Sequence, residues 1–160
     1  ASDKRSRMAV QKAIIDETED LIMAMAQIPT NHTILSILNK RCLKAAKNMK
    51  KIMPETKGIK TRVQEYEARY NASKEMSKAS TSEENFILPE DETALVGILQ
   101  CIKKLRITLK SEQSKGALDP QLFIQEDGKL DAMQLKINIE SLLKRGNMAY
   151  NKEMLGSARQ

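Results

Sequence analysis

The sequence predicts an all-α fold, an antiparallel bundle of about four long helices followed by a C-terminal helical hairpin. Aromatic residues make up only 3% of the 160-residue chain and Trp is absent. The core must therefore be built from Leu, Ile, Met and Ala, which suits packing between helices better than a sheet. Nine methionines favour the same fold, because Met fills irregular gaps between helices. Apolar residues recur at helical spacing, and strict two-residue alternation persists nowhere.

A single domain is expected from the chain length. It divides into a four-helix core over 1–115, a loop over 116–128 and a repeat-like hairpin over 129–160. The first helix is expected over 4–28 and ends at Pro29, because the proline ring cannot continue the hydrogen-bond ladder.

The second helix can be capped by Thr30 or Asn31 and is expected to end near Met53. It is amphipathic and contains no acidic residue. At 100° per residue, its apolar face holds Leu35, Leu38, Cys42, Ala45, Met49 and Ile52. The opposite face holds Lys40, Lys44, Lys47 and Lys51.

The third helix begins at Glu55 or Lys57 and runs to Ala79, and the polar stretch Ser77–Asn85 reads as a loop. The fourth helix, over 89–115, has the strongest periodicity in the chain. Its apolar seam consists of Leu95, Ile98, Ile102, Leu105 and Leu109. Two heptads indicate the core of a helix bundle rather than a coiled coil.

After the fourth helix, Asp119 and Pro120 are typical of a cap and a first helical turn. Asp127-Gly128 is interpreted as a second turn, which leads into a fifth helix over 129–152. The residues from 154 onward are expected to start a sixth helix. The chain begins at Ala1 and ends inside a helical pattern at 160, so we expect both ends to be boundaries within a larger protein.

The C-terminal stretch Leu142–Gln160 resembles the first helix and turn of a tetratricopeptide repeat. The matching positions are Leu142, Gly146, Ala149 and Ala158. Arg145 replaces the usual Leu, and Tyr150 is shifted by one position from the expected aromatic. A helical hairpin that uses Gly146 and Ala158 for close packing is the alternative. The resemblance implies binding to other proteins rather than catalysis.

Positive charge is concentrated in the first half of the chain. The net charge is +6, and residues 1–80 hold 16 Lys and Arg against 9 Asp and Glu. If the first two helices fold back on each other about Pro29, the acidic group Asp16, Glu17, Glu19 and Asp20 can neutralise Lys40 and Arg41.

The remaining cations meet at one end of the bundle, which we call the basic pole, with only Asp3 and Glu55 nearby. It consists of Lys4, Arg5, Arg7, Lys47, Lys50, Lys51, Lys57, Lys60 and Arg62. A solvated face is the plain interpretation. The alternatives are an anionic protein, an anionic membrane surface and nucleic acid. The scarcity of aromatics and the lack of a helix-turn-helix or zinc motif argue against nucleic acid.

No catalytic, cofactor or metal site is predicted. The only histidine, His32, has no partner at metal-ligand or triad spacing. The stretch Phe123–Gln134 resembles a calcium loop, but its first, third and twelfth positions lack ligand side chains. Cys42 and Cys101 lie on apolar faces and are expected to be reduced and buried.

The sequence therefore predicts a non-enzymatic helical scaffold that binds proteins. We expect it to be cytoplasmic. One form of this prediction is the cytosolic part of a larger protein that a flanking segment anchors to a membrane. The alternative is a nucleic-acid-binding domain that acts through the basic pole. The sequence leaves the oligomeric state open.

Overall fold

The computed structural model describes the backbone of residues 2–79 and 88–158, and the side chains of 3–79, 88–147 and 149–153. Within these ranges every regular element is helical, which confirms the all-α fold. The elements are α1 (Ser2–Ala24), the short 3₁₀ helix η1 (Met25–Gln27), α2 (His32–Ile52), α3 (Ile59–Ala79), α4 (Glu92–Ser114) and α5 (Pro120–Ala158). Part of the predicted loop Ser77–Asn85 lies outside the described residues.

The boundaries follow local chemistry. Ile28 is extended before Pro29, as a residue preceding proline must be, so the first helix cannot continue. The Asn31 side chain caps α2, because its Oδ1 accepts a hydrogen bond from the Ile34 amide at 3.0 Å. Gly116 follows α4 with a φ of 78°, a conformation that favours glycine and allows the chain to turn toward α5.

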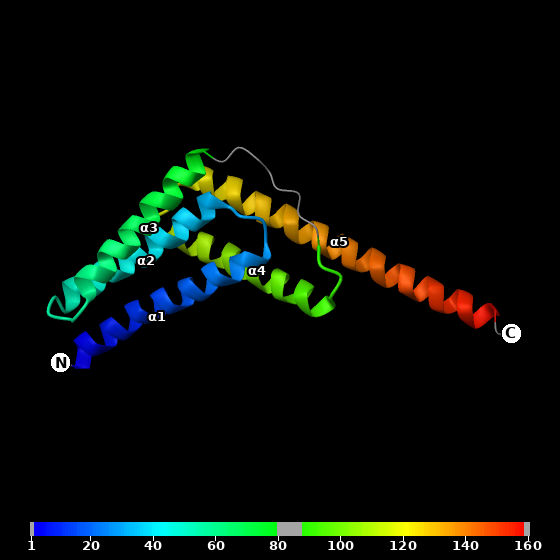
Figure 1. Ribbon diagram of the computed structural model, residues 1–160, viewed down its shortest axis with the longest axis horizontal. Coiled ribbons are helices and arrows are strands. Elements are labelled where there is room, and N and C mark those ends of the chain that lie inside the picture. The colour runs from blue at the N-terminus through cyan, green and yellow to red at the C-terminus, as the bar shows by residue number, and fades with distance from the viewer. Residues whose placement is uncertain (1, 80–87, 159–160) are drawn as a thin grey trace.

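The helices form two connected groups (Figure 1). In the first group α1, α2 and α3 run alternately up and down, so that α2 packs between its neighbours in the sequence. Hydrogen bonds from Asn48 to Gln11 and from Arg41 to Thr18 fix the antiparallel register of α1 on α2. In the second group α4 and α5 form an antiparallel pair, and α4 also contacts α1.

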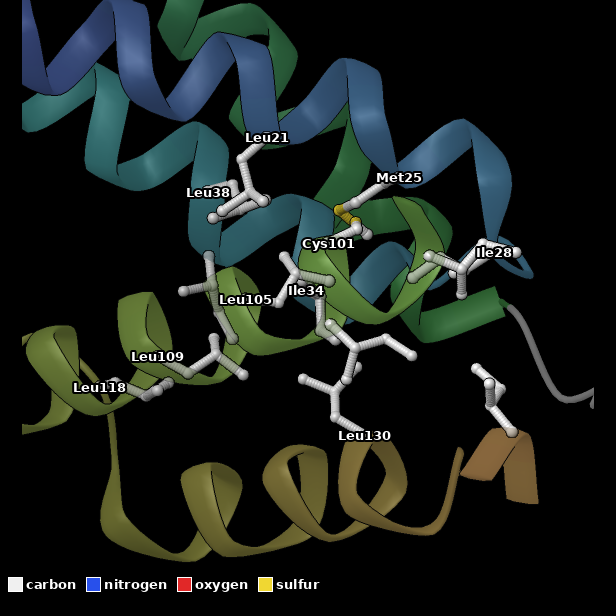
Figure 2. Close-up of a cluster of buried hydrophobic side chains, with 14 of the residues drawn as sticks. Leu21, Met25, Ile28, Ile34, Leu38, Cys101, Leu105, Leu109, Leu118 and Leu130 are labelled. Atoms are coloured by element: carbon white, nitrogen blue, oxygen red, sulfur yellow. The ribbon is translucent and has the colours of Figure 1, made fainter. Parts of the chain in front are cut away.

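Two hydrophobic clusters hold these groups together. The smaller one lies among α1, α2 and α3 and includes Ile15, Cys42 and Tyr66. The larger one joins the end of α1 and the start of α2 to α4 and α5, as Figure 2 shows. The predicted seam of the fourth helix is buried in this cluster, where Ile102, Leu105 and Leu109 are fully shielded from solvent. Burial of such apolar side chains is the main favourable contribution to folding.

The predicted neutralisation of Arg41 by the acidic residues of α1 is wrong. Arg41 instead points toward α4, where its Nη1 lies 2.9 Å from Glu112 Oε1. Its Nε donates to Thr18 Oγ1 at 3.1 Å. Glu19 accepts a hydrogen bond from the Tyr66 hydroxyl. Arg41 thus bonds both α1 and α4, a contact that the pairing of α1 with α2 alone does not predict.

The C-terminal part of the chain also differs from the prediction. A loop over 116–128, a helix over 129–152 and a hairpin were expected, but α5 is one helix of 39 residues. Asp127-Gly128 therefore lies inside a helix and is not a turn. Tertiary contacts explain the difference, because Glu126 and Asp127, directly before Gly128, are held by Asn31 and by Arg106. Such contacts outweigh the cost of about 1 kcal/mol for a glycine in a helix.

Candidate functional site

The basic pole exists as one end of the molecule. The first turns of α1, the last turns of α2 and the start of α3 meet there (Figure 1). All nine of its side chains are exposed except that of Arg62, which is half-buried. None of the ion pairs between described residues involves any of the nine. The structure thus brings the predicted cations together on an open surface.

A shallow groove of about 320 Å³ crosses this pole between α1 and α2. Its walls combine two cations, two amides and two apolar side chains: Arg7, Lys51, Gln11, Asn48, Val10 and Ile52. Asn48 Nδ2 donates to Gln11 Oε1 at 3.3 Å, which holds the two amides together at the base of the positive surface. Such a lining suits an anionic group attached to an apolar one.

A second surface lies on α5 and was missed by the sequence analysis. The large apolar side chains of this helix lie on two opposite faces. Leu130 and Ile137 are buried in the larger cluster, whereas Leu135, Ile139 and Leu142 are 58%, 48% and 66% exposed. The exposed positions share one face with small residues at helical spacing. We call this face the outer stripe and define it as Ala132, Leu135, Ile139, Leu142, Gly146 and Ala149, flanked by Leu143 and Tyr150.

The outer stripe continues beyond the rest of the molecule, because the C-terminal part of α5 extends away from the other helices (Figure 1). Between Asn138 and Glu153, every described side chain except that of Ser141 is exposed. A lone exposed leucine is ordinary, but a continuous apolar strip on a protruding helix marks an interaction surface.

The half of α5 that packs on the other helices is held by polar contacts from Arg106 and from Asn31. Arg106 of α4 donates from Nε to Asp127 at 2.9 Å, and from Nη1 to Asp131 and Gln134 at 3.0 Å each. The two carboxylates, Asp127 first and then Asp131, raise the pKa of Arg106. Glu126 accepts from Asn31 Nδ2 at 2.9 Å, so the residue that caps α2 also anchors α5. The contacts fix the rotation of α5 and direct its outer stripe to solvent.

The acidic and thiol groups that the sequence raised as candidate sites take part in the packing of the fold. Asp127 binds Arg106, and no group of three or more potential metal ligands occurs among the described residues. Cys42 and Cys101 are free and buried, as predicted. Burial raises the pKa of Cys42 to about 12 and also raises that of Cys101, so both thiols stay protonated near neutral pH.

Comparison of the chain with protein-family models, with curated proteins and with solved structures returned no match. The turn expected between Gly146 and Ala158 is replaced by continuous helix, and the resemblance to a tetratricopeptide repeat stays a prediction. Across the described parts of the chain, the helices are all too short or too polar to span a bilayer.

Proposed function

We propose that this chain is a non-enzymatic helical scaffold domain that binds other proteins through the outer stripe of α5. The carrying observation is the apolar strip from Ala132 to Ala149, which faces solvent on the side of α5 opposite to the core. A partner that buries these side chains gains about 1.5–3 kcal/mol of binding free energy for each large apolar side chain that it fully covers. A partner helix with its own apolar stripe supplies the matching shape.

The three positions of the tetratricopeptide resemblance with described side chains support the same function. Leu142, Gly146 and Ala149 all lie on the outer stripe. In a repeat, residues at these spacings pack against a neighbouring helix. The resemblance and the exposure therefore point to the same face of α5.

The proposal is tested by placing a photo-crosslinking amino acid at Leu142 in cells that make the protein. We expect discrete crosslinked protein products, because the partner covers this position. The matched control is Glu140, which is exposed on the same part of α5 but lies off the stripe. Equal crosslinking at Leu142 and Glu140 would contradict the proposal.

A second proposed role belongs to the basic pole. Its nine cations have no carboxylate partner among the described residues, and we propose that they face an anionic membrane surface next to a membrane-anchored part of a larger protein. Each Lys or Arg near such a surface adds about 1 kcal/mol of attraction. Binding of duplex DNA is the alternative use of the same charges.

Binding to anionic phospholipid vesicles distinguishes these roles. We expect the protein to bind vesicles, and the triple substitution Lys47/Lys50/Lys51→Glu to abolish binding. The control Lys103/Lys104/Lys110→Glu makes the same change in charge at exposed positions of α4 and should leave binding largely intact. If instead the protein binds duplex DNA with an affinity that falls steeply with salt, the pole serves nucleic acid. Binding to neither would leave it a solvated face.

A further inference from the structure

We propose that the partner of the outer stripe is a second copy of the same chain, with the two α5 helices packed antiparallel. This inference rests on the proposed function and names its partner. Three observations on α5 carry it: the spacing of the stripe, the glycine within it and the match of the stripe to itself.

The spacing of the stripe is that of a coiled-coil seam. From Ala132 to Ala149 its positions alternate steps of three and four residues, in the order Ala132, Leu135, Ile139, Leu142, Gly146 and Ala149. A helix with this spacing presents a straight seam to one other helix. The seam faces away from the molecule's own core, since Leu130 and Ile137 on the opposite side are buried. Among the described residues no helix covers the seam, so it is open to a helix from a second molecule.

Gly146 has no packing role among the described residues of one copy of the chain. It lies inside α5, which continues to Ala158, so it does not terminate the helix. A Cβ built on it would meet no atom of the described residues within 4 Å, so none of the described elements of the same molecule needs the space. A glycine inside a helix costs about 1 kcal/mol relative to alanine. Close approach of a side chain from another molecule accounts for it.

The stripe is complementary to itself when the helices run antiparallel. With Ile139 opposite Leu142 of the second copy, two-fold symmetry places Leu135 opposite Gly146 and Ala132 opposite Ala149. The large leucine then enters the hollow above the glycine, and this happens twice. A parallel pair would instead set glycine against glycine and leave a gap at the seam.

The charges beside the stripe favour the same arrangement. In this register Asp131 of one copy lies beside Lys152 of the other, where it can accept a second cation in addition to Arg106. Tyr150 lies beside Lys129 of the second copy, which allows a cation–π contact. The protruding half of each α5 would thereby cover the body-attached half of the other (Figure 1).

Engineered cysteines test the pairing directly. The purified double variant Leu135→Cys/Gly146→Cys should form disulfide-linked dimers of twice the 18.1 kDa chain mass under mild oxidation. Neither single variant should do so, because identical positions would lie about 16 Å apart along the helices. The native thiols do not interfere, since both are buried. Crosslinking by Leu135→Cys alone would indicate a parallel pair, and crosslinking by Leu135→Cys/Ile139→Cys instead would indicate another register; either result overturns the arrangement.

Sedimentation of the unmodified protein provides the second measurement. The average mass should rise with concentration toward twice the chain mass, and Leu142→Asp should abolish the rise. Ile124→Asp is the matched control, because Ile124 is also exposed on α5, at 66%, but lies outside the paired stretch. A protein that stays monomeric at every concentration and forms no disulfide dimer overturns self-association. If Leu142 then still crosslinks to a different protein in cells, the proposed function stands without it.

Discussion

Replacing Ile102 by Asp is expected to unfold the domain or to lower its free energy of unfolding by at least about 4 kcal/mol. Ile102 is fully buried in the larger cluster, where α4 meets the other helices. The substitution removes an apolar side chain and places a carboxylate in a cluster of buried hydrophobic residues. Burial of such an unpaired group is among the costliest single changes, and whole-domain stability is only about 5–15 kcal/mol.

Thermal or urea unfolding followed by circular dichroism measures the effect. Ile107→Asp is the matched control, because it makes the same change on the same helix at a residue that is 69% exposed. The control should change the free energy of unfolding by no more than about 0.5 kcal/mol. Similar melting of both variants would show that α4 is not at the centre of the fold.

The buried seam of α4 could be read from the sequence because a buried helix face requires a regular repeat. The basic pole could also be predicted, since Pro29 ends the first helix and a short connection favours an antiparallel pair of α1 and α2. The hydrogen bond from Asn48 Nδ2 to Gln11 Oε1 agrees with that pairing. Periodicity and turn chemistry are local properties, and they fixed these features without any knowledge of the tertiary fold.

The outer stripe could not be separated from the core in the same way. Apolar residues occur on both sides of α5, and the sequence does not state which side the molecule itself covers. Gly128 also led to the wrong prediction of a turn within α5, because a glycine after an aspartate is typical of a turn. The contacts of Arg106 with Asp127 and of Asn31 with Glu126 show why the helix continues there, and both join residues on different helices.

The polar interior of the bundle provides the second large expected effect. Glu112→Ala should lower the free energy of unfolding by about 3–5 kcal/mol, because it leaves the Arg41 guanidinium buried without its carboxylate. The two side chains are only 10% and 7% exposed, and Nη1 lies 2.9 Å from Oε1. The hydrogen bond from Arg41 Nε to Thr18 cannot replace the lost charge, since the Thr18 hydroxyl is neutral and itself donates to the Ile14 carbonyl.

Two controls distinguish the cost of leaving Arg41 without its carboxylate from the net contribution of the Arg41–Glu112 pair to stability. Glu75→Ala breaks the Glu75–Lys78 pair, whose side chains are 75% and 65% exposed, and should cost at most about 1 kcal/mol. The double variant Arg41→Met/Glu112→Leu removes both charges and should recover most of the stability that Glu112→Ala loses, because apolar side chains of similar size often replace a buried pair without loss. Urea unfolding of all three variants tests the argument. If Glu112→Ala were as mild as Glu75→Ala, water would have to reach Arg41, and the link between α2 and α4 would then rest on apolar packing alone.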